Sequence, residues 1–307
     1  MAAERVPVLE VGGTHVSAAL IDVADWSIVA GTLSRHGLDG QASAAQLLGA
    51  FVAAADTLDA AEAARWGVAL PGPFDYARGI ALFENVGKFD SLRGVDVRAA
   101  LCQDISPRPE SVSFLNDADA FVLGEWLHGA ATGYRRCAAL TLGTGVGSGF
   151  LADGQIVGSG PDVPPDGRAH RVLIDGQPLE DRVSRRAIRA AYRAATGDAG
   201  ADVREIAERA RGGEATARAV IDTAMTTLGT ALAPYFDRFG AQVVVIGGSM
   251  SASWDLFGPA FVARLPDPID VVVAHNPEHA PLLGAARYAL MTSRSECADA
   301  PTGSTTA

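Results

Sequence analysis

The chain has 307 residues, is 48% hydrophobic and 20% charged, and carries a formal net charge of −11. This length and hydrophobicity suffice for two lobes with their own cores, whereas the negative charge opposes binding to nucleic acid or to anionic lipid. Lys88 is the only lysine and no GxxxxGK[ST] sequence is present, so the composition excludes a Walker-type phosphate site.

The cysteines and the two ends of the chain favour a cytoplasmic protein. Cys102, Cys137 and Cys297 are widely spaced and form no CxxC pair, which predicts reduced thiols. The first residues lack the apolar core of a signal peptide, and no later apolar run reaches membrane-spanning length. We therefore expect no membrane contact, and we expect the small, polar residues 294–307 to form a disordered tail.

The first predicted elements form a hairpin with a glycine-rich turn. Apolar strands are predicted over 6–11 and 16–23, and Gly12, Gly13 and Thr14 join them. The glycines let the backbone approach a ligand closely and Thr14 adds a hydroxyl for a phosphate oxygen, although hairpins also use glycine without any ligand. Glu10 brings an acid toward the same turn, where it can hold Mg²⁺ through water.

The next elements lead from this hairpin to a loop. A third strand is predicted over 27–33, a helix over 46–58 and a strand over 66–70, which runs into the rigid turn Pro71-Gly72-Pro73. A short strand then precedes a loop that contains Asn85 and Lys88. Such a loop either closes over a small polar ligand or is a plain surface connection.

The central segment combines an acid with a second glycine turn. A buried strand is predicted over 112–115, and it delivers Asn116 and Asp117 to the start of an amphipathic helix. Ordinary N-capping is the alternative explanation of that pair. A second apolar run, 138–142, ends in GTGVG, a turn that offers backbone N–H groups and the Thr144 hydroxyl to an anion.

The second half contains an irregular loop and a third glycine turn. Asp153-Gly154 predicts a hairpin, and residues 158–170, which include Asp166 and His170, have three prolines and no periodicity. Helical patterns follow over 179–211 and 214–236. A strand over 243–246 ends in Gly247-Gly248-Ser249, and a strand over 270–274 precedes a helix over 281–291. Three turns of this kind in one chain favour ligand binding over folding alone.

Six short motifs occur in a characteristic order over nearly the whole chain. They are EVGGT at 10–14, PGP at 71–73, NDAD at 116–119, LGTGVGSG at 142–149, LE at 179–180 and IGGS at 246–249. This series resembles the ROK family of bacterial sugar kinases and repressors. The resemblance implies an α/β fold of the two-lobed actin/hexokinase-like ATPase type, with a ribonuclease-H-like core and an interlobe cleft in which ATP and sugar meet. The lobes would be 1–116 with about 281–293, and 117–280.

The resemblance also implies roles for individual residues. Asp117 would be the general base that takes the proton of the sugar 6-hydroxyl, with ATP and Mg²⁺ as the phosphoryl donor. Phosphoryl transfer needs mainly positioning and charge neutralisation. The ATP-binding residues would be Gly12, Gly13, Thr14, Thr144, Gly145, Gly247 and Gly248, and the sugar-binding residues Asn85, Asn116, His170 and Glu180. A homodimer is expected, since ROK kinases are often dimers.

This sequence departs from the family pattern at three places. Glu10 replaces the usual aspartate, and the zinc-binding CxCGxxGCxE motif is replaced by RVLIDGQPLE at 171–180, so no zinc site is expected. The sugar motif GExGH reads DGRAH, with Gly167 in place of the glutamate and Asp166 as the nearest acid. A carboxylate matched to an ammonium group forms a charge-assisted hydrogen bond. These changes suggest that kanosamine, a 3-amino hexose, is a better substrate than glucose.

Three functions compete for this sequence. The first is an ATP-dependent hexose 6-kinase acting on glucose, kanosamine, another hexosamine or mannose. The second is the repressor branch of the family, which normally adds an N-terminal helix-turn-helix domain, whereas the first strand here begins at about Val6. The third is a sugar-sensing pseudokinase, suggested by Glu10 and Gly167 and opposed by Asp117 and the three glycine turns. We expect the kinase.

Overall fold

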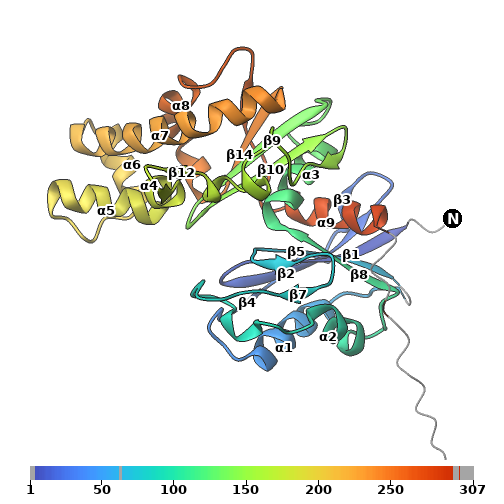
Figure 1. The fold of residues 1–307 in the computed structure, drawn as a ribbon. Helices are drawn as coiled ribbons and strands as arrows, with labels where there is room; N and C mark the ends of the chain where they lie inside the picture. Colours follow the sequence, from blue (N-terminus) through green and yellow to red (C-terminus); the bar gives the residue numbers. More distant parts are fainter. Residues whose placement is uncertain (1–3, 62–63, 293–296, 298–307) are drawn as a thin grey trace, which may run out of the picture. The chain divides into compact units, whose positions relative to one another are not determined.

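The computed structural model describes residues 4–61, 64–292 and 297. They form two compact units (Figure 1). The first unit contains the chain up to Ala120 and from Pro281 onward, and the second contains Phe121–Ala280. The sequence analysis placed the division slightly earlier, after Asn116.

A six-stranded sheet organises the first unit. Its strands β1, β5 and β8 are parallel, with β8 at the edge, and β2 pairs antiparallel with β1. Because the carboxyl ends of parallel strands meet at one edge, Glu10 lies opposite Ala69, and Leu70 lies opposite Asn116. The strands are β1 (Arg5–Val11), β2 (His15–Asp22), β3 (Ser27–Ile28), β4 (Ser34–Gly37), β5 (Arg65–Leu70) and β8 (Ser111–Asn116).

Helices cover both faces of this sheet. Figure 1 shows α1 (Ala44–Ala55) and α2 (Val97–Asp104) on one face and α9 (Ala280–Met291) on the other. A Cβ at Gly67 of β5 would lie 2.2 Å from the Ala285 carbonyl oxygen, so glycine is needed for α9 to pack this closely. A short hairpin of β6 (Phe74–Asp75) and β7 (Ile80–Ala81) follows β5.

Two elements of this unit differ from the sequence prediction. The strand predicted over 27–33 is wrong: β3 ends at Ile28, and the chain turns at Gly31, whose φ is +79°. The strand resumes as β4, which also pairs with β2. Helix α2 was not predicted. Asp96 caps it by accepting a hydrogen bond from the Ala99 N–H at 2.8 Å.

The second unit repeats the same strand pattern in a five-stranded sheet. An antiparallel hairpin, β9 and β10, is followed by two strands parallel to β9. The strands are β9 (Arg136–Leu142), β10 (Val146–Ala152), β11 (Gln155–Ile156), β14 (Val243–Gly247) and β15 (Asp270–Val273); β12 (Leu173–Ile174) and β13 (Gln177–Pro178) form a separate pair.

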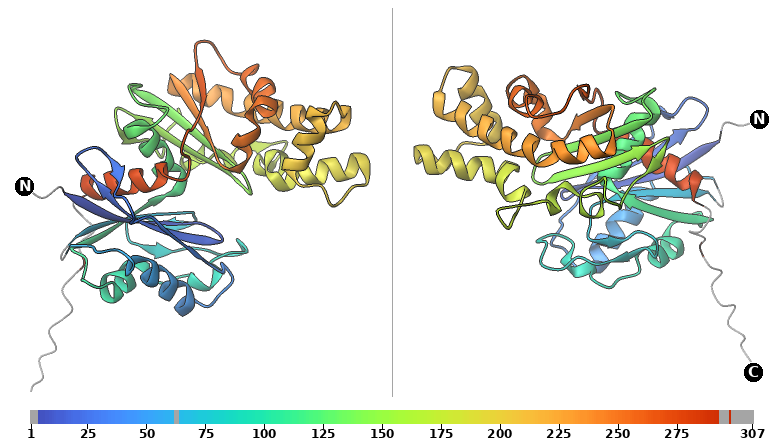
Figure 2. Two further views of the ribbon diagram at one scale, coloured as in Figure 1. Left: turned by 180° about the vertical axis from the view of Figure 1, so that it is seen from behind. Right: turned by 45° about the horizontal axis from the view of Figure 1, so that its top comes forward.

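Helix α7 packs on the sheet of this unit, whereas α5 and α6 pack against α7 and extend away from the sheet (Figure 2). Phe236 of the longest helix, α7, belongs to the core that contains Leu140 and Ile246 of the sheet. Pro234 lies inside α7, which continues to Phe239, three residues beyond the predicted end. The helices are α3 (Asp117–His128), α4 (Glu180–Val183), α5 (Arg185–Thr196), α6 (Val203–Arg211), α7 (Ala215–Phe239) and α8 (Trp254–Val262). Within the described part of the chain, none of the helices combines the length and apolarity that a membrane span requires.

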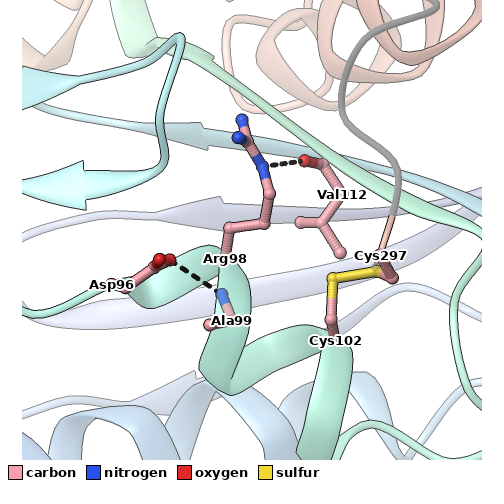
Figure 3. Close-up of a disulfide and its surroundings, with 6 residues drawn as sticks. All are labelled: Asp96, Arg98, Ala99, Cys102, Val112 and Cys297. Atoms are coloured by element: carbon pink, nitrogen blue, oxygen red, sulfur yellow. Dashed lines mark hydrogen bonds between the residues drawn. A yellow bond between two sulfur atoms is a disulfide. The ribbon is translucent and has the colours of Figure 1, made fainter. Parts of the chain in front are cut away.

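The cysteines correct one expectation. Cys102 of α2 and Cys297 form a disulfide, with 5.5 Å between their Cα atoms (Figure 3). The prediction of reduced thiols is therefore wrong for this pair. The two cysteines are 195 residues apart, so no local sequence pattern indicates that they pair. Cys137 is a buried free thiol, and burial raises its pKa to about 12. The rest of the predicted tail, 294–296 and 298–307, lies outside the described residues.

Candidate active site

Asn116 and Asp117 lie where β8 ends and α3 begins. Both side chains accept a hydrogen bond from the same backbone group: the Ala118 nitrogen is 3.1 Å from Asn116 Oδ1 and 2.9 Å from Asp117 Oδ1. This is the N-capping geometry that the sequence analysis kept as an alternative. Capping and catalysis are compatible here, because the cap fixes the direction of the carboxylate.

Asn116 also contacts a residue that the sequence analysis did not single out. Its Nδ2 lies 3.1 Å from the hydroxyl of Tyr76, and that hydroxyl donates to the Leu70 carbonyl oxygen at 3.2 Å. Tyr76 follows the Pro71-Gly72-Pro73 turn closely, and this proximity is the sequence feature that could have identified it. The polar groups at the ends of β5 and β8 are thus connected through one phenol.

The first glycine turn is shaped by a histidine. The Gly12 N–H donates to the His15 carbonyl oxygen at 2.8 Å, which closes the turn between β1 and β2. A Cβ at Gly12 would lie 3.0 Å from His15 Cε1, whereas one at Gly13 would be in ordinary contact, 3.5 Å from Lys88 Cδ. Lys88 therefore lies beside this turn, and its ammonium adds a positive charge that suits a phosphate.

A chain of polar contacts orients Glu10. Its Oε2 accepts from Ser17 Oγ at 3.3 Å and lies 3.6 Å from His15 Nε2. On the other side of the ring, His15 Nδ1 lies 3.3 Å from both Arg35 Nη2 and Thr14 Oγ1. Because a guanidinium only donates, Nδ1 accepts and the ring hydrogen is on Nε2, facing Glu10. Neither His15 nor Arg35 was identified from the sequence.

The loop after β7 is fixed by a carboxylate. Asp90 accepts from the Val86 N–H at 3.0 Å and the Gly87 N–H at 3.1 Å. Asn85 precedes these groups with a φ of +57°, a left-handed conformation that asparagine tolerates better than most residues. Asn85 is exposed, and its proposed contact with sugar stays a prediction.

The second glycine turn brings two predicted site residues together. The Gly143 N–H donates to the Gly145 carbonyl oxygen at 3.1 Å, and the Val146 N–H donates to Glu180 Oε2 at 3.0 Å. A Cβ at Gly145 would lie 2.6 Å from the same carboxylate oxygen. Glu180, predicted to bind sugar, therefore also supports the turn, while Thr144 is exposed at its tip.

The third glycine turn packs against the second. Gly248 has a φ of +80°, and a Cβ there would lie 2.4 Å from the Leu142 carbonyl oxygen. A Cβ at Gly247 would lie 2.4 Å from the ring of Phe121, and one at Gly143 would lie 3.3 Å from Ser249 Oγ. The glycines predicted to bind nucleotide in this unit, together with Thr144, therefore gather in one place.

A cavity that the sequence did not reveal opens beside the third turn. Its volume is about 560 Å³, within the range of small-molecule sites. Arg185 connects this cavity to the second turn. Its backbone N–H donates to the Gly143 carbonyl oxygen at 2.9 Å, and its side-chain Nε donates to Asp202 Oδ1 at 2.8 Å. This guanidinium holds the pKa of Asp202 below its usual value. The lining residues are Arg185, Asp202, Val203, Arg204, Glu208, Arg211, Ser249, Met250, Ala252, Ser253 and Phe257.

The loop that contains the altered sugar motif is fastened to β10. The buried Ser148 hydroxyl donates to the Gly167 carbonyl oxygen at 2.8 Å and accepts from the Ala169 N–H at 2.7 Å, next to His170. Gly167 has a φ of +70°, a conformation that disfavours a glutamate here.

Asp166 in the same loop is not an unengaged carboxylate. It forms an ion pair with Arg171, and the two side chains are 65% and 52% exposed. The predicted preference for an amino sugar requires this carboxylate to pair with an ammonium group. That group would have to compete with Arg171, and the exposed ion pair is of the weak kind. The preference for kanosamine stays a prediction.

The described residues offer few metal ligands. In the segments 4–61, 64–292 and 297, no group of three or more His, Cys, Asp or Glu side chains is arranged to hold an ion. Mg²⁺ needs less than that, since it usually retains several waters and binds through one or two carboxylates together with substrate phosphates. The oriented carboxylate of Glu10, close to the first glycine turn, fits this requirement.

Comparison with known proteins gives a consistent result. The model of the ROK family matches residues 7–162 and 175–292. A glucokinase from Thermotoga maritima is 31% identical over 259 residues, which cover 74% of this chain and 80% of that protein.

Solved structures agree with this match. A ROK hexokinase from Thermus thermophilus superposes with a TM-score of 0.75 at 25% identity, over 94% of this chain and 98% of that one. A ROK family glucokinase from Streptomyces griseus, in complex with glucose and AMPPNP, gives a TM-score of 0.74 at 23% identity, over 94% and 100% of the two chains. The predicted α/β fold of the actin/hexokinase-like type is confirmed.

Proposed function

The chain belongs to the ROK family, and we propose that it is a glucokinase-like sugar kinase that transfers the γ-phosphoryl group of ATP to the 6-hydroxyl of a hexose. The observation that carries this proposal is the Asn116–Asp117 pair at the end of β8, where one backbone N–H holds both side chains. The similarity to a glucokinase and to a glucokinase bound to glucose and AMPPNP supports the choice of substrates.

Asp117 acts as the general base in this proposal. Its carboxylate accepts the proton of the 6-hydroxyl while the hydroxyl oxygen bonds to the γ-phosphorus. The bond from that phosphorus to the bridging oxygen breaks, and ADP leaves with the electron pair. A positioned base of this kind contributes roughly 10²- to 10⁴-fold to the rate. Asn116 binds sugar hydroxyls beside it.

The glycine turns and the cavity serve the nucleotide. Backbone N–H groups of the turns contact phosphate oxygens, and the cavity beside Ser249 takes the nucleoside, with Arg185 linking the two. Bound with ATP, Mg²⁺ neutralises phosphate charge. Glu10, oriented by His15 and Ser17, would hold it through water.

Glucose is the sugar that we propose. The ammonium group of kanosamine would have to compete with Arg171 for Asp166, whereas glucose needs no such exchange. Comparing kcat/KM for the two sugars in the wild type and in Asp166→Ala tests this: glucose should be preferred in both. If the wild type prefers kanosamine and the variant loses this preference, kanosamine is the better substrate and Asp166 recognises its amino group.

The homodimer and the cytoplasmic location stay predictions. Size-exclusion chromatography with light scattering tests the first. The Cys102–Cys297 disulfide removes one argument for the second, because disulfides are rare in the cytosol.

A coupled assay of ADP release with a panel of hexoses tests the activity, with NMR to locate the phosphate on the product. Asp117→Asn should lower kcat by about 10²- to 10⁴-fold while glucose still binds. Asp96→Asn is the matched control: Asp96 also caps a helix, α2, and its variant should keep full activity. Normal turnover in Asp117→Asn contradicts the assignment of the base. Sugar binding without phosphorylation in the wild type would favour a non-catalytic, sugar-sensing regulator.

A further inference from the structure

The amide of Asn116 is held in one orientation by two different partners. The Ala118 N–H can only donate, so the group that faces it at 3.1 Å is Oδ1. The Tyr76 hydroxyl has a single hydrogen, which it gives to the Leu70 carbonyl oxygen at 3.2 Å. Toward Asn116 it therefore accepts, and the group that faces it at 3.1 Å is Nδ2. Both contacts require the same orientation of the amide.

Tyr76 is itself anchored to the strand that carries Asn116. Arg98 of α2 donates from Nε to the Val112 carbonyl oxygen of β8 at 3.0 Å, which Figure 3 shows. The same guanidinium donates to the carbonyl oxygens of Ala77 at 3.0 Å and Tyr76 at 3.3 Å. One side chain thus ties the segment of Tyr76 to β8. Burial lowers the pKa of Arg98, against the raising effect of Asp96 and Asp75.

Two glycines make room for this arrangement. A Cβ at Gly79, where φ is +78°, would lie 2.5 Å from Arg98 Cβ. A Cβ at Gly72, inside the Pro-Gly-Pro turn, would lie 3.3 Å from the Tyr76 hydroxyl. The turn thus positions the phenol as well as directing the exit of β5.

The fixed amide has a chemical consequence. One Nδ2 hydrogen of Asn116 is directed at Tyr76, so the second is the donor that Asn116 can offer to a ligand. A sugar hydroxyl has lone pairs to accept it, whereas an ammonium group has three donors and no acceptor. The arrangement therefore favours a hydroxyl over an ammonium group at the ligand position that faces Nδ2 of Asn116.

We propose that Tyr76 is a positioning residue of the sugar site, which fixes Asn116 as a hydrogen-bond donor and thereby selects neutral hydroxyls against amino groups. This inference rests on the proposed hexose kinase function. Tyr76 acts through Asn116, so its loss should weaken sugar binding and selectivity more than turnover of bound sugar.

The test compares Tyr76→Phe with the wild type. Calorimetry without nucleotide should show a glucose Kd raised about five- to tenfold. This is the cost of one hydrogen bond, the one from Asn116 to the sugar, which weakens when Tyr76 no longer orients the amide. The value of kcat should change less than twofold, and the preference for glucose over its 2-amino and 3-amino analogues should fall at least threefold. Tyr134→Phe is the matched control, because it removes a hydroxyl that donates to Asp270 in the second unit and should leave sugar binding unchanged.

A second variant reverses the donor. Asn116→Asp replaces the Nδ2 donor by an acceptor, so glucose binding should weaken at least tenfold and the amino analogues should gain relative to glucose. If the wild type phosphorylates glucose and Tyr76→Phe binds and selects sugars as the wild type does, the inference fails alone. If the wild type neither binds nor phosphorylates any hexose, the proposed function fails with it.

Discussion

The turn between β1 and β2 and the turn between β9 and β10 occupy equivalent places in two sheets with the same strand pattern, but different contacts hold them. In the first unit, side chains surround the turn: His15 lies against Gly12, Lys88 lies beside Gly13, and neither glycine has a positive φ. In the second unit the glycines are more tightly enclosed: a Cβ at Gly145 of the β9–β10 turn would lie 2.6 Å from Glu180 Oε2, and one at Gly248, in the neighbouring third turn, would lie 2.4 Å from the Leu142 carbonyl oxygen.

The difference shows that a glycine motif can be required for two reasons. A glycine without space for a Cβ is needed for folding, whatever it binds. A glycine with space around it is dispensable for folding, so its effect on function can be measured separately. The two units therefore predict a graded series of substitutions.

Gly248→Ala should have the largest effect. The backbone at Gly248, with φ +80° and ψ 173°, costs an alanine about 1–3 kcal/mol, and the overlap with Leu142 adds to it, giving roughly 3 kcal/mol or more in the free energy of unfolding. Gly213→Ala is the control, because its φ is +92° but nothing lies within 4 Å of a Cβ there. Urea denaturation of both variants separates backbone strain from overlap, and equal losses would contradict the role of Leu142.

Glu180→Ala should be next. It leaves the Val146 N–H without its carboxylate acceptor, which costs about 1–2 kcal/mol of stability. Glu180→Gln keeps an acceptor oxygen and should lose about 0.5 kcal/mol or less. Thermal unfolding distinguishes them. If both variants unfold at the same temperature, the hydrogen bond from the Val146 N–H to Glu180 does not stabilise the second turn.

His15→Asn should have a smaller effect on stability, within about 1 kcal/mol, since His15 is partly exposed and its contacts are side-chain contacts. Without its ring Glu10 is less well oriented, so we expect the Mg²⁺ concentration needed for half-maximal nucleotide binding to rise about fivefold. His36→Asn on β4 is the control. Titration with a fluorescent ATP analogue measures the shift. An unchanged Mg²⁺ requirement would show that His15 does not orient Glu10 for Mg²⁺ binding.

Gly13→Ala should affect stability least. Its Cβ would make an ordinary contact with Lys88, so the free energy of unfolding should stay within about 0.5 kcal/mol of the wild type. Any increase in the KM for ATP then comes from weaker ATP binding and not from a less stable fold. A destabilisation as large as that of Gly248→Ala would show that the glycine turns of the two units do not differ in the way described.

Much of the fold was readable from the sequence because its signals are local. The apolar runs before Gly12, Asn116, Gly143 and Gly247 became strands that end within one residue of the predicted positions, since a continuous apolar run and the turn residue after it act over a short stretch of chain. The strand predicted over 27–33 failed at Gly31, where the positive φ breaks pairing that hydrophobicity alone favours. The order of the motifs was sufficient to identify the family.

The sequence by itself determined where the candidate site residues lie along the chain, because a carboxylate at a strand end and glycines in turns are local features. Only the tertiary structure decided their partners. Tyr76 with Asn116, Arg35 with His15, Arg171 with Asp166 and Cys102 with Cys297 come together through pairing and packing. Hydrogen bonds and ion pairs depend on distances of a few ångströms in space, and three of these four pairs are separated by 20 to 195 residues of chain.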